Sequence, residues 1–208
     1  MFKIQKLNNL VLVLFFLQST TILTSDLVNS TNHIKTIIFG AGCFWSVEKK
    51  FQETFGVIDV ESGYADGANI KPLYEEIIKR ENRFNPDNYA EVVRVTYNNN
   101  KTNLENLLKT FFEMHDPTQE NRQGNDVGVQ YRSVILTSSQ EEIMLSKKIK
   151  NIYQNLLSQK GYGIIKTNIK KLTNFYLAED YHQDYLKKNP NGYCPDNSTG
   201  IVFSKNPR

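Results

Sequence analysis

The stretch GAGCFW, residues 40–45, is the part of the sequence around which the rest of the chain is organised. It follows a run of β-branched and apolar residues, 35–39, that is typical of a buried strand. Beyond it, apolar side chains recur at helical spacing, at Phe44, Val47, Phe51 and Phe55. We therefore expect Cys43 to lie where a strand turns through two glycines into a helix.

Cys43 at such a turn is predicted to be a reactive thiol. The backbone N–H groups and the dipole of a helix start favour an anion, which should lower the pKa of the thiol. The alternative is a structural cysteine, because cysteine is among the most frequently buried residue types. A Gly-Cys turn at a helix start exposes the sulfur, and this favours the reactive thiol.

The two aromatic residues after Cys43 carry different information. Phe44 lies on the apolar stripe of the predicted helix, so core packing accounts for it. Trp45, the only tryptophan of the chain, lies about 100° away around the helix. We expect Trp45 to form the wall of a pocket that would accept an apolar group of a substrate.

The composition sets limits on the class of protein. The 208 residues provide one domain with a real core. The net charge of +3 arises from 25 basic and 22 acidic residues without long runs, so nothing indicates nucleic-acid binding. Cys43 and Cys194 are the only cysteines. Such a pair predicts either a structural disulfide or a redox pair that opens and closes during turnover.

The first residues resemble a signal peptide. Lys3 and Lys6 precede an apolar run over 10–17, which is too short to span a bilayer. We therefore expect a signal peptide over 1–25, a linker over 26–34 and a catalytic domain over 35–208 with a mobile C-terminal tail. The predicted location is the secretory pathway, the periplasm or the extracellular space, without stable membrane association after cleavage. A transit peptide to an organelle is the alternative.

Strands and helices alternate along the remaining chain. The strands are too few for a large parallel sheet, which predicts an α+β two-layer sandwich, ferredoxin-like in part. Capping boxes are expected at Thr102 with Glu105 and at Ser138 with Glu141. The expected elements are a strand over 57–61, a glycine-marked loop over 62–67, a helix over 73–79, a strand over 89–97, a helix carrying 104–112, a polar loop over 118–130, a strand over 131–137, a long helix ending at Gly161, a strand over 164–172 and a helix over 177–187.

Glu91 lies near the start of the strand predicted over 89–97. If Val93 and Val95 face the core, the two-residue period of a strand turns Glu91 the same way. Either Glu91 is a solvated residue at a strand end, or it is buried. Burial would raise the pKa of its carboxyl, because desolvation disfavours the charged form.

Seven motifs together resemble the A-type peptide methionine sulfoxide reductases, in the order of that family and over residues 36–205. They are GCFW (42–45), SGYA (62–65), YEE (74–76), AEVV (90–93), NRQGNDVGVQYRS (121–133), AEDYHQ (178–183) and GYC (192–194). The resemblance implies a mixed sheet and reduction of methionine-(S)-sulfoxide, free or in proteins, as a repair of oxidised proteins.

The resemblance also implies roles for individual residues. Cys43 is the expected nucleophile, Glu91 the proton donor and Cys194 the resolving cysteine, with thioredoxin or a thioredoxin-like protein as the reductant. Further expected site residues bond the sulfoxide oxygen, support the site or hold the substrate methyl group: Tyr74 and Tyr131, Asp126, and Phe44 with Trp45, respectively. No metal or other cofactor is expected, and the protein is expected to be a monomer.

The chain departs from the family pattern in three places. Tyr89 stands where histidine is common, so the hydrogen bonding beside Glu91 differs. Asp66 stands where glycine is usual. Only one cysteine, Cys194, lies in the tail, which leaves no relay between two tail cysteines.

Two other functional classes compete with a reductase. A cysteine hydrolase or transferase would pair Cys43 with a histidine base, for which His33, His115 and His182 are the candidates. A secreted, non-enzymatic domain would use Cys43 and Cys194 as a permanent disulfide. That second class leaves Trp45, Glu91 and the polar loop without a purpose.

Overall fold

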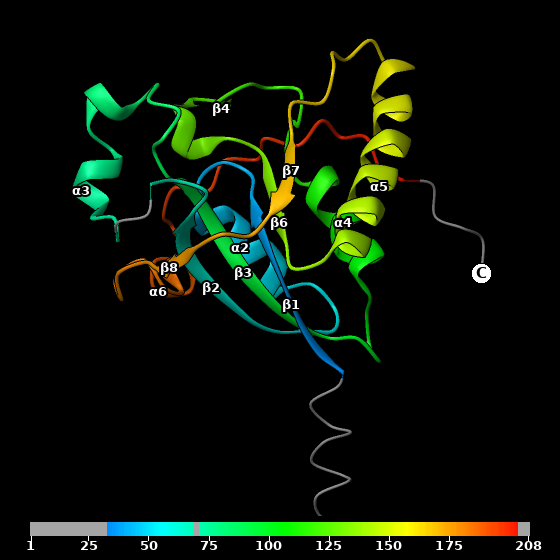
Figure 1. Cartoon of the computed structure of the whole chain (residues 1–208), viewed down its shortest axis with the longest axis horizontal. Coiled ribbons are helices and arrows are strands. Elements are labelled where there is room, and N and C mark those ends of the chain that lie inside the picture. Colours follow the sequence, from blue (N-terminus) through cyan, green and yellow to red (C-terminus); the bar gives the residue numbers. More distant parts are fainter. Residues whose placement is uncertain (1–32, 69–70, 204–208) are drawn as a thin grey trace, which may run out of the picture. The chain divides into compact units, whose positions relative to one another are not determined.

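The computed structural model describes residues 33–68 and 71–203 (Figure 1). The predicted signal peptide, and all of the linker except its last two residues, lie outside the described residues. The chain divides into residues 1–35 and 36–208, and the description below concerns the second part. None of the described helices is long and apolar enough to cross a bilayer.

A six-stranded mixed sheet forms the centre of this part, in the order β7-β6-β1-β3-β2-β8. The β1–β6, β2–β3 and β2–β8 pairs are antiparallel, whereas β6 and β7 are parallel. The strands are β1 (Ile34–Gly40), β2 (Val57–Ala65), β3 (Ala90–Asn98), β6 (Val134–Thr137), β7 (Asn168–Lys171) and β8 (Phe175–Leu177). A separate hairpin pairs β4 (Arg122–Gln123) with β5 (Asp126–Val127).

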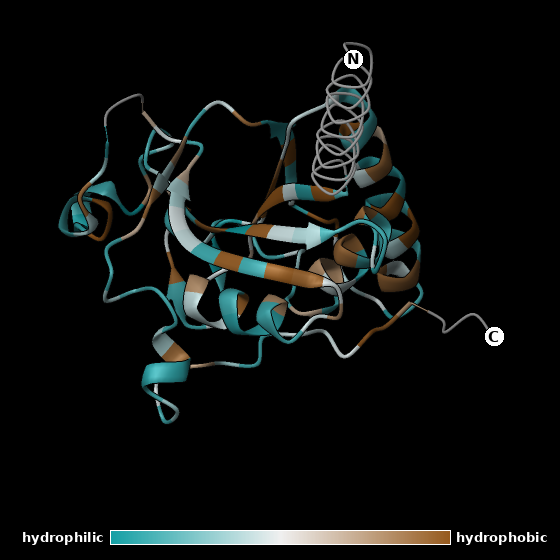
Figure 2. Cartoon of the chain, turned by 90° about the horizontal axis from the view of Figure 1, so that it is seen from below, coloured by the Kyte–Doolittle hydropathy of each residue, from teal (hydrophilic) through white to brown (hydrophobic). Residues whose placement is uncertain are grey.

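Helices cover one face of the sheet. They are α2 (Phe44–Gln52), α4 (Leu104–Glu113) and α5 (Gln140–Ser158), with the short helices α3 (Tyr74–Ile77) and α6 (Tyr185–Lys188) and the 3-10 turns η1 (Arg80–Asn82) and η2 (Val129–Tyr131) outside this layer. In the core beneath the helices, the Phe39 ring of β1 stacks on Phe51 of α2 and on Phe111 of α4, each at 4.9 Å between centroids. Figure 2 shows hydrophobic residues on the strands and on the helices that pack against them. The predicted α+β class and mixed sheet are confirmed.

The second face of the sheet carries a smaller apolar cluster. Because β7 and β8 lie at opposite edges, the chain between them must cross this face, as Figure 1 shows. Leu172 and Phe175 from this crossing pack on Ile38, Ala65, Ala90, Val92, Val134 and Leu136. Gly63 permits the close approach, since a Cβ there would lie 2.5 Å from the Phe175 ring.

Two expectations around β2 are wrong. The helix α2 ends at Gln52, so Phe55 lies outside it with 76 % of its surface exposed. The chain turns there through Gly56, whose φ of +84° suits glycine. The predicted loop over 62–67 is strand as far as Ala65, because its backbone pairs with β3 on one side and β8 on the other.

Three helix boundaries also differ from expectation. Asn103 and Ser139 cap α4 and α5, each one residue later than predicted, by accepting the N–H groups of Asn106 and Glu142. The helix predicted over 177–187 is wrong: β8 ends at Leu177, and α6 begins only at Tyr185. The intervening segment is not helical because Gln183 bonds both backbone groups of Ser62 and the carbonyl of Ala178.

Two further strands are shorter than predicted. The strand expected over 131–137 begins at Val134, because residues 129–131 form the η2 turn. The strand expected over 164–172 is limited to residues 168–171, which pair with β6. The polar loop over 118–130 contains the β4–β5 hairpin, which stands beside the end of the sheet that carries the candidate site.

The core can be tested with two phenylalanines of one region. Phe51→Ala should lower the free energy of unfolding by about 3–5 kcal/mol, because it removes a fully buried ring that stacks on Phe39. Phe55→Ala, the matched control, should change it by less than about 0.5 kcal/mol. Denaturant unfolding of both variants measures the difference, and equal losses would contradict the described end of α2.

Candidate active site

Cys43 lies between β1 and α2, at the N-cap of the helix. The turn requires glycine before it, because Gly42 has φ +95° and a Cβ there would lie 2.8 Å from the Cβ of Gln123. The thiol is half-buried. Burial raises the pKa of Cys43 and the nearby Glu91 raises it further, while the N–H groups of Trp45 and Ser46 lower it. The expectation of a lowered pKa is therefore wrong for the free protein, because desolvation outweighs the helix start.

Glu91 lies on β3 with its side chain in the protein interior, only 2 % exposed. Its Oε2 accepts the backbone N–H of Phe44 at 3.2 Å, so the carboxyl sits at the first turn of α2, next to Cys43. Burial raises the pKa of Glu91 to about 8, the bond from Phe44 opposes this, and Asp126 adds to it. Of the two alternatives for Glu91, the buried carboxyl is the one that the structure shows.

The electrostatics of Glu91 and Cys43 are linked. A charged Glu91 raises the pKa of the Cys43 thiol, because the negative charges of a thiolate and a carboxylate repel each other. Near neutral pH the Glu91 carboxyl is largely protonated, and this repulsion is then absent. The pair can hold one negative charge far more readily than two.

Tyr74 on α3, Tyr131 on η2 and Asp126 on β5 come together with this pair. Burial, then Glu91, raises the pKa of Tyr74 to about 12, and the same two causes raise the pKa of Tyr131. Both phenols thus stay neutral and able to donate a hydrogen bond near neutral pH. The Asp126 Oδ1 atom accepts the Tyr193 hydroxyl at 3.2 Å, while its buried Oδ2 has no bonded partner among the described residues.

Phe44 and Trp45 belong to an aromatic cluster. Phe44 is one of the buried residues of α2. Trp45 is only half-buried, and its ring stacks on that of Tyr185 at 3.7 Å between centroids. The Trp45 indole Nε1–H donates to Nδ1 of His182 at 3.1 Å. The His182 ring also touches Phe44 and Tyr74, so it lies at the centre of the cluster.

Sequence reasoning considered His182 only as a candidate base for Cys43 and assigned no role to Tyr185. It placed both on a helix over 177–187, where they could not have been recognised as partners of Trp45. The available signal was the motif AEDYHQ itself, which is dense in aromatic and polar residues and lacks an apolar stripe.

Cys194 is exposed and lies in the tail segment, whose described residues from 189 to 203 form no helix or strand. It borders a groove of about 410 Å³ that also contains Ser46 and Lys49 of α2. The predicted mobility of the tail stays a prediction. In the structure both cysteines are free thiols.

A histidine base for Cys43 finds no support among the described residues. The His115 nitrogens bond the Phe111 carbonyl and the Ser133 hydroxyl, and burial lowers the pKa of this ring to about 4. The Nδ1 of His182 is occupied by Trp45.

The raised pKa of Glu91 makes the stability of the protein depend on pH. The folded value of about 8 exceeds the ordinary 4.5, so the native state keeps a proton that the unfolded chain loses between these values. The stabilisation from this proton is complete below pH 4.5 and is lost as the pH rises to 8. Across this window, reduced wild type should therefore lose on the order of 4 kcal/mol relative to Glu91→Gln. If the unfolding free energies of wild type and Glu91→Gln changed in parallel with pH, Glu91 would be an ordinary, solvated carboxyl.

Comparison with known proteins agrees with this site. The family described as Peptide methionine sulfoxide reductase matches residues 35–204. The peptide methionine sulfoxide reductase MsrA of Corynebacterium kroppenstedtii is 45 % identical over 173 residues, which cover 81 % of this chain and 76 % of the relative.

Solved structures of the same enzymes share the fold. Methionine sulfoxide reductase A of Corynebacterium diphtheriae superposes with a TM-score of 0.72 at 40 % identity, covering 82 % of each chain. Mxr1 of Saccharomyces cerevisiae, solved in complex with Trx2, has a TM-score of 0.50 at 27 % identity, over 74 % of this chain and 86 % of Mxr1. The chain therefore belongs to the peptide methionine sulfoxide reductase family.

Proposed function

We propose that this oxidoreductase reduces the S epimer of methionine sulfoxide, free or in proteins, with Cys43 as nucleophile and Glu91 as general acid. The observation that carries the proposal is the buried Glu91 carboxyl beside the Cys43 thiol, with a pKa of about 8. Sulfoxide oxygen is a poor leaving group unless it is protonated, and a glutamate with a pKa near its ordinary value would have no proton to give at neutral pH.

In the first step, the Cys43 sulfur attacks the sulfoxide sulfur while Glu91 gives its proton to the sulfoxide oxygen. The S–O bond of the substrate breaks and leaves the Cys43 sulfur bonded to a sulfonium, with the oxygen released as hydroxide. The hydroxide attacks the Cys43 sulfur, the sulfur–sulfur bond breaks, and the products are methionine and a sulfenic acid at Cys43. The proton of the Cys43 thiol replaces the one that Glu91 gave. The carboxyl therefore ends the step as it began, and the total charge of the site does not change.

Tyr74 and Tyr131 serve as neutral hydrogen-bond donors to the sulfoxide oxygen in this proposal. Their raised pKa values keep the phenolic protons in place, and both feel Glu91 and Cys43 electrostatically. Donors held at the position where charge develops stabilise the transition state most. Asp126 supports the site because its charge raises the pKa of Glu91.

The aromatic cluster is the proposed site of the substrate methyl group. The Trp45 ring stacks on Tyr185 and donates a hydrogen bond from its Nε1 to His182. These two contacts fix the ring of the residue that follows Phe44. Together with Phe44, the Trp45 ring offers an apolar wall to the methyl group on the substrate sulfur.

In the second step, the Cys194 thiol attacks the Cys43 sulfenic acid, water leaves, and a Cys43–Cys194 disulfide forms. The groove that joins Cys194 to Ser46 supports this, because it places the tail along the helix that Cys43 caps. A disulfide requires Cα atoms within about 7 Å. A thioredoxin-type dithiol then reduces the disulfide, and the complex of the relative Mxr1 with Trx2 supports this choice of reductant.

The test compares two cysteine variants on the separated sulfoxide epimers. Cys43→Ser should lose reduction of the S epimer even with excess dithiothreitol, because a serine hydroxyl cannot be oxidised to a sulfenic acid. Cys194→Ser, the matched control, should still reduce one equivalent of S epimer per enzyme and should accumulate a sulfenic acid at Cys43 that dimedone labels. Its turnover with thioredoxin should fall sharply, whereas dithiothreitol should restore turnover.

Different failures of this experiment point to different steps. Substantial turnover by Cys43→Ser would contradict the nucleophile. Normal thioredoxin-supported turnover by Cys194→Ser would contradict the resolving role alone. Preference for the R epimer would contradict the proposed stereochemistry.

A further inference from the structure

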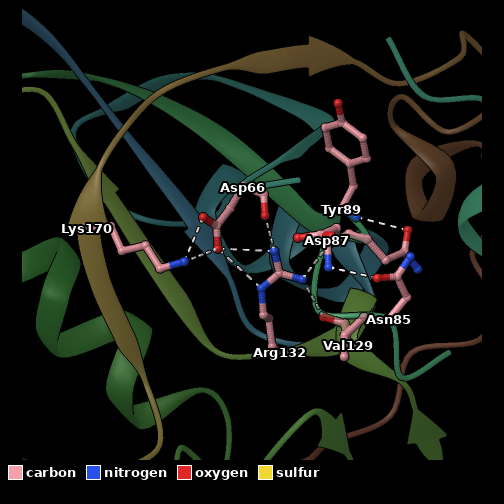
Figure 3. Close-up of polar contacts among 8 residues, drawn as sticks. Asp66, Asn85, Asp87, Tyr89, Val129, Arg132 and Lys170 are labelled. Carbon is pink, nitrogen blue, oxygen red and sulfur yellow. Dashed lines mark hydrogen bonds and ion pairs between the residues drawn. The ribbon is translucent and has the colours of Figure 1, made fainter. Parts of the chain in front are cut away.

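Arg132 directly follows Tyr131 in the sequence, and the residue is only 8 % exposed. All five of its N–H donors are used (Figure 3). Nε and one Nη2 proton reach the Asp66 carboxylate at 3.3 and 3.1 Å, and the second Nη2 proton reaches the Asp66 carbonyl. The two Nη1 protons reach the carbonyls of Asn88 at 3.1 Å and Val129 at 2.8 Å.

These acceptors belong to three segments that end at the candidate active site. Val129 begins the η2 turn that carries Tyr131. Asn88 lies three residues before Glu91, at the entrance to β3. Asp66 directly follows β2, which pairs with β3 throughout this end of the sheet. One buried side chain thus joins the backbone that presents the proton donor to the backbone that presents a phenol.

Asp66 is the member of this node with an unusual backbone. Its φ of +57° lies in the left-handed region, which glycine adopts freely and other residues seldom do. Besides Arg132, its carboxylate accepts Lys170 Nζ at 2.8 and 2.9 Å. Such a conformation persists where the surroundings hold it firmly, and here two cations hold the carboxylate.

We propose that Asp66 is a positioning residue: its carboxylate fixes Arg132, and through Arg132 it fixes the place of Tyr131 relative to Glu91 and Cys43. Without this carboxylate, two donors of a buried guanidinium lose their partners, which is costly unless the group moves. Arg132 borders a polar cavity of about 320 Å³ that also contains Lys150 and Thr167, so it has room to move. Movement would shift the carbonyls of Val129 and Asn88 with it.

The inference rests on the proposed role of Tyr131, and a double-mutant cycle separates the two. Asp66→Gly suits the backbone at φ +57° and removes only the carboxylate. It should slow single-turnover reduction of the S epimer by roughly 10–100-fold, the scale of a small misplacement in a site. In a Tyr131→Phe background, where no phenolic proton is left to position, the same substitution should cost less than about twofold.

Two further variants control the cycle. Glu61→Gln removes a carboxylate on β2 that pairs with Arg94 at 2.5 Å, and it should leave the rate within about twofold of wild type in both backgrounds. Asp66→Asn keeps one acceptor oxygen and should show a smaller, still Tyr131-dependent loss. If Asp66→Gly does not fold, as judged by circular dichroism and thermal unfolding, the cycle is run with Asp66→Asn.

Each outcome decides a specific point. If Asp66→Gly lowered the rate equally in the wild-type and Tyr131→Phe backgrounds, the inference would be overturned. The effect of a purely structural Asp66 would not depend on Tyr131. An unchanged rate in Asp66→Gly would also overturn it, while the role of Tyr131 would stand. If Tyr131→Phe alone were as fast as wild type, the proposed role of Tyr131 would fail and the inference with it.

Discussion

The candidate active site depends on the burial of the Glu91 carboxyl beside the Cys43 thiol. Water at this place would return the carboxyl to an ordinary pKa and leave it ionised at neutral pH. The fold excludes water by placing Glu91 on the helix-covered side of a central strand and letting it accept the Phe44 N–H. The same bond closes the start of α2 over the carboxyl. An acid that holds its proton and a thiol that is spared the negative charge of Glu91 therefore arise from one arrangement.

The sheet topology explains how distant segments reach this pair. β1 and β3 are neighbours, so the turn after β1, with Cys43, lies next to the start of β3, with Glu91. On the side of β3 away from β1, β2 pairs with β3, and β8 pairs with β2. The chain after β8 therefore reaches the site, where His182 accepts the hydrogen bond of Trp45. The β4–β5 hairpin and the η2 turn supply Asp126 and Tyr131. These groups come from different segments at one end of the sheet, and the strands set the distances among them.

The features that were predicted correctly from the sequence are those that neighbouring residues determine. The strand before Cys43 and the apolar faces of α2 and α4 follow from residue spacing, and the structure has them. For Glu91 the spacing left a solvated and a buried carboxyl open, and the structure shows the buried one. Phe55 was predicted wrongly because α2 ends at Gln52, before the turn at Gly56. The region of 62–67 and the helix over 177–187 were predicted wrongly because contacts distant in sequence decide them. Gln183 bonds Ser62, 121 residues away, and thereby prevents a helix that the local sequence permits. The thiol pKa failed for the same reason, since desolvation depends on everything that packs around Cys43. His182 and the Asp66–Arg132 ion pair likewise have partners that no local pattern reveals.

Burial beside Cys43 should keep the Glu91 carboxyl protonated at neutral pH. Carbon-13 NMR of the glutamate carboxyl carbons in the reduced protein measures this protonation directly, with Glu91→Gln used to assign the resonance. We expect the Glu91 signal to titrate with a midpoint near pH 8. A midpoint near the ordinary 4.5 would show an ionised carboxylate at neutral pH and would contradict Glu91 as the acid that protonates the sulfoxide oxygen.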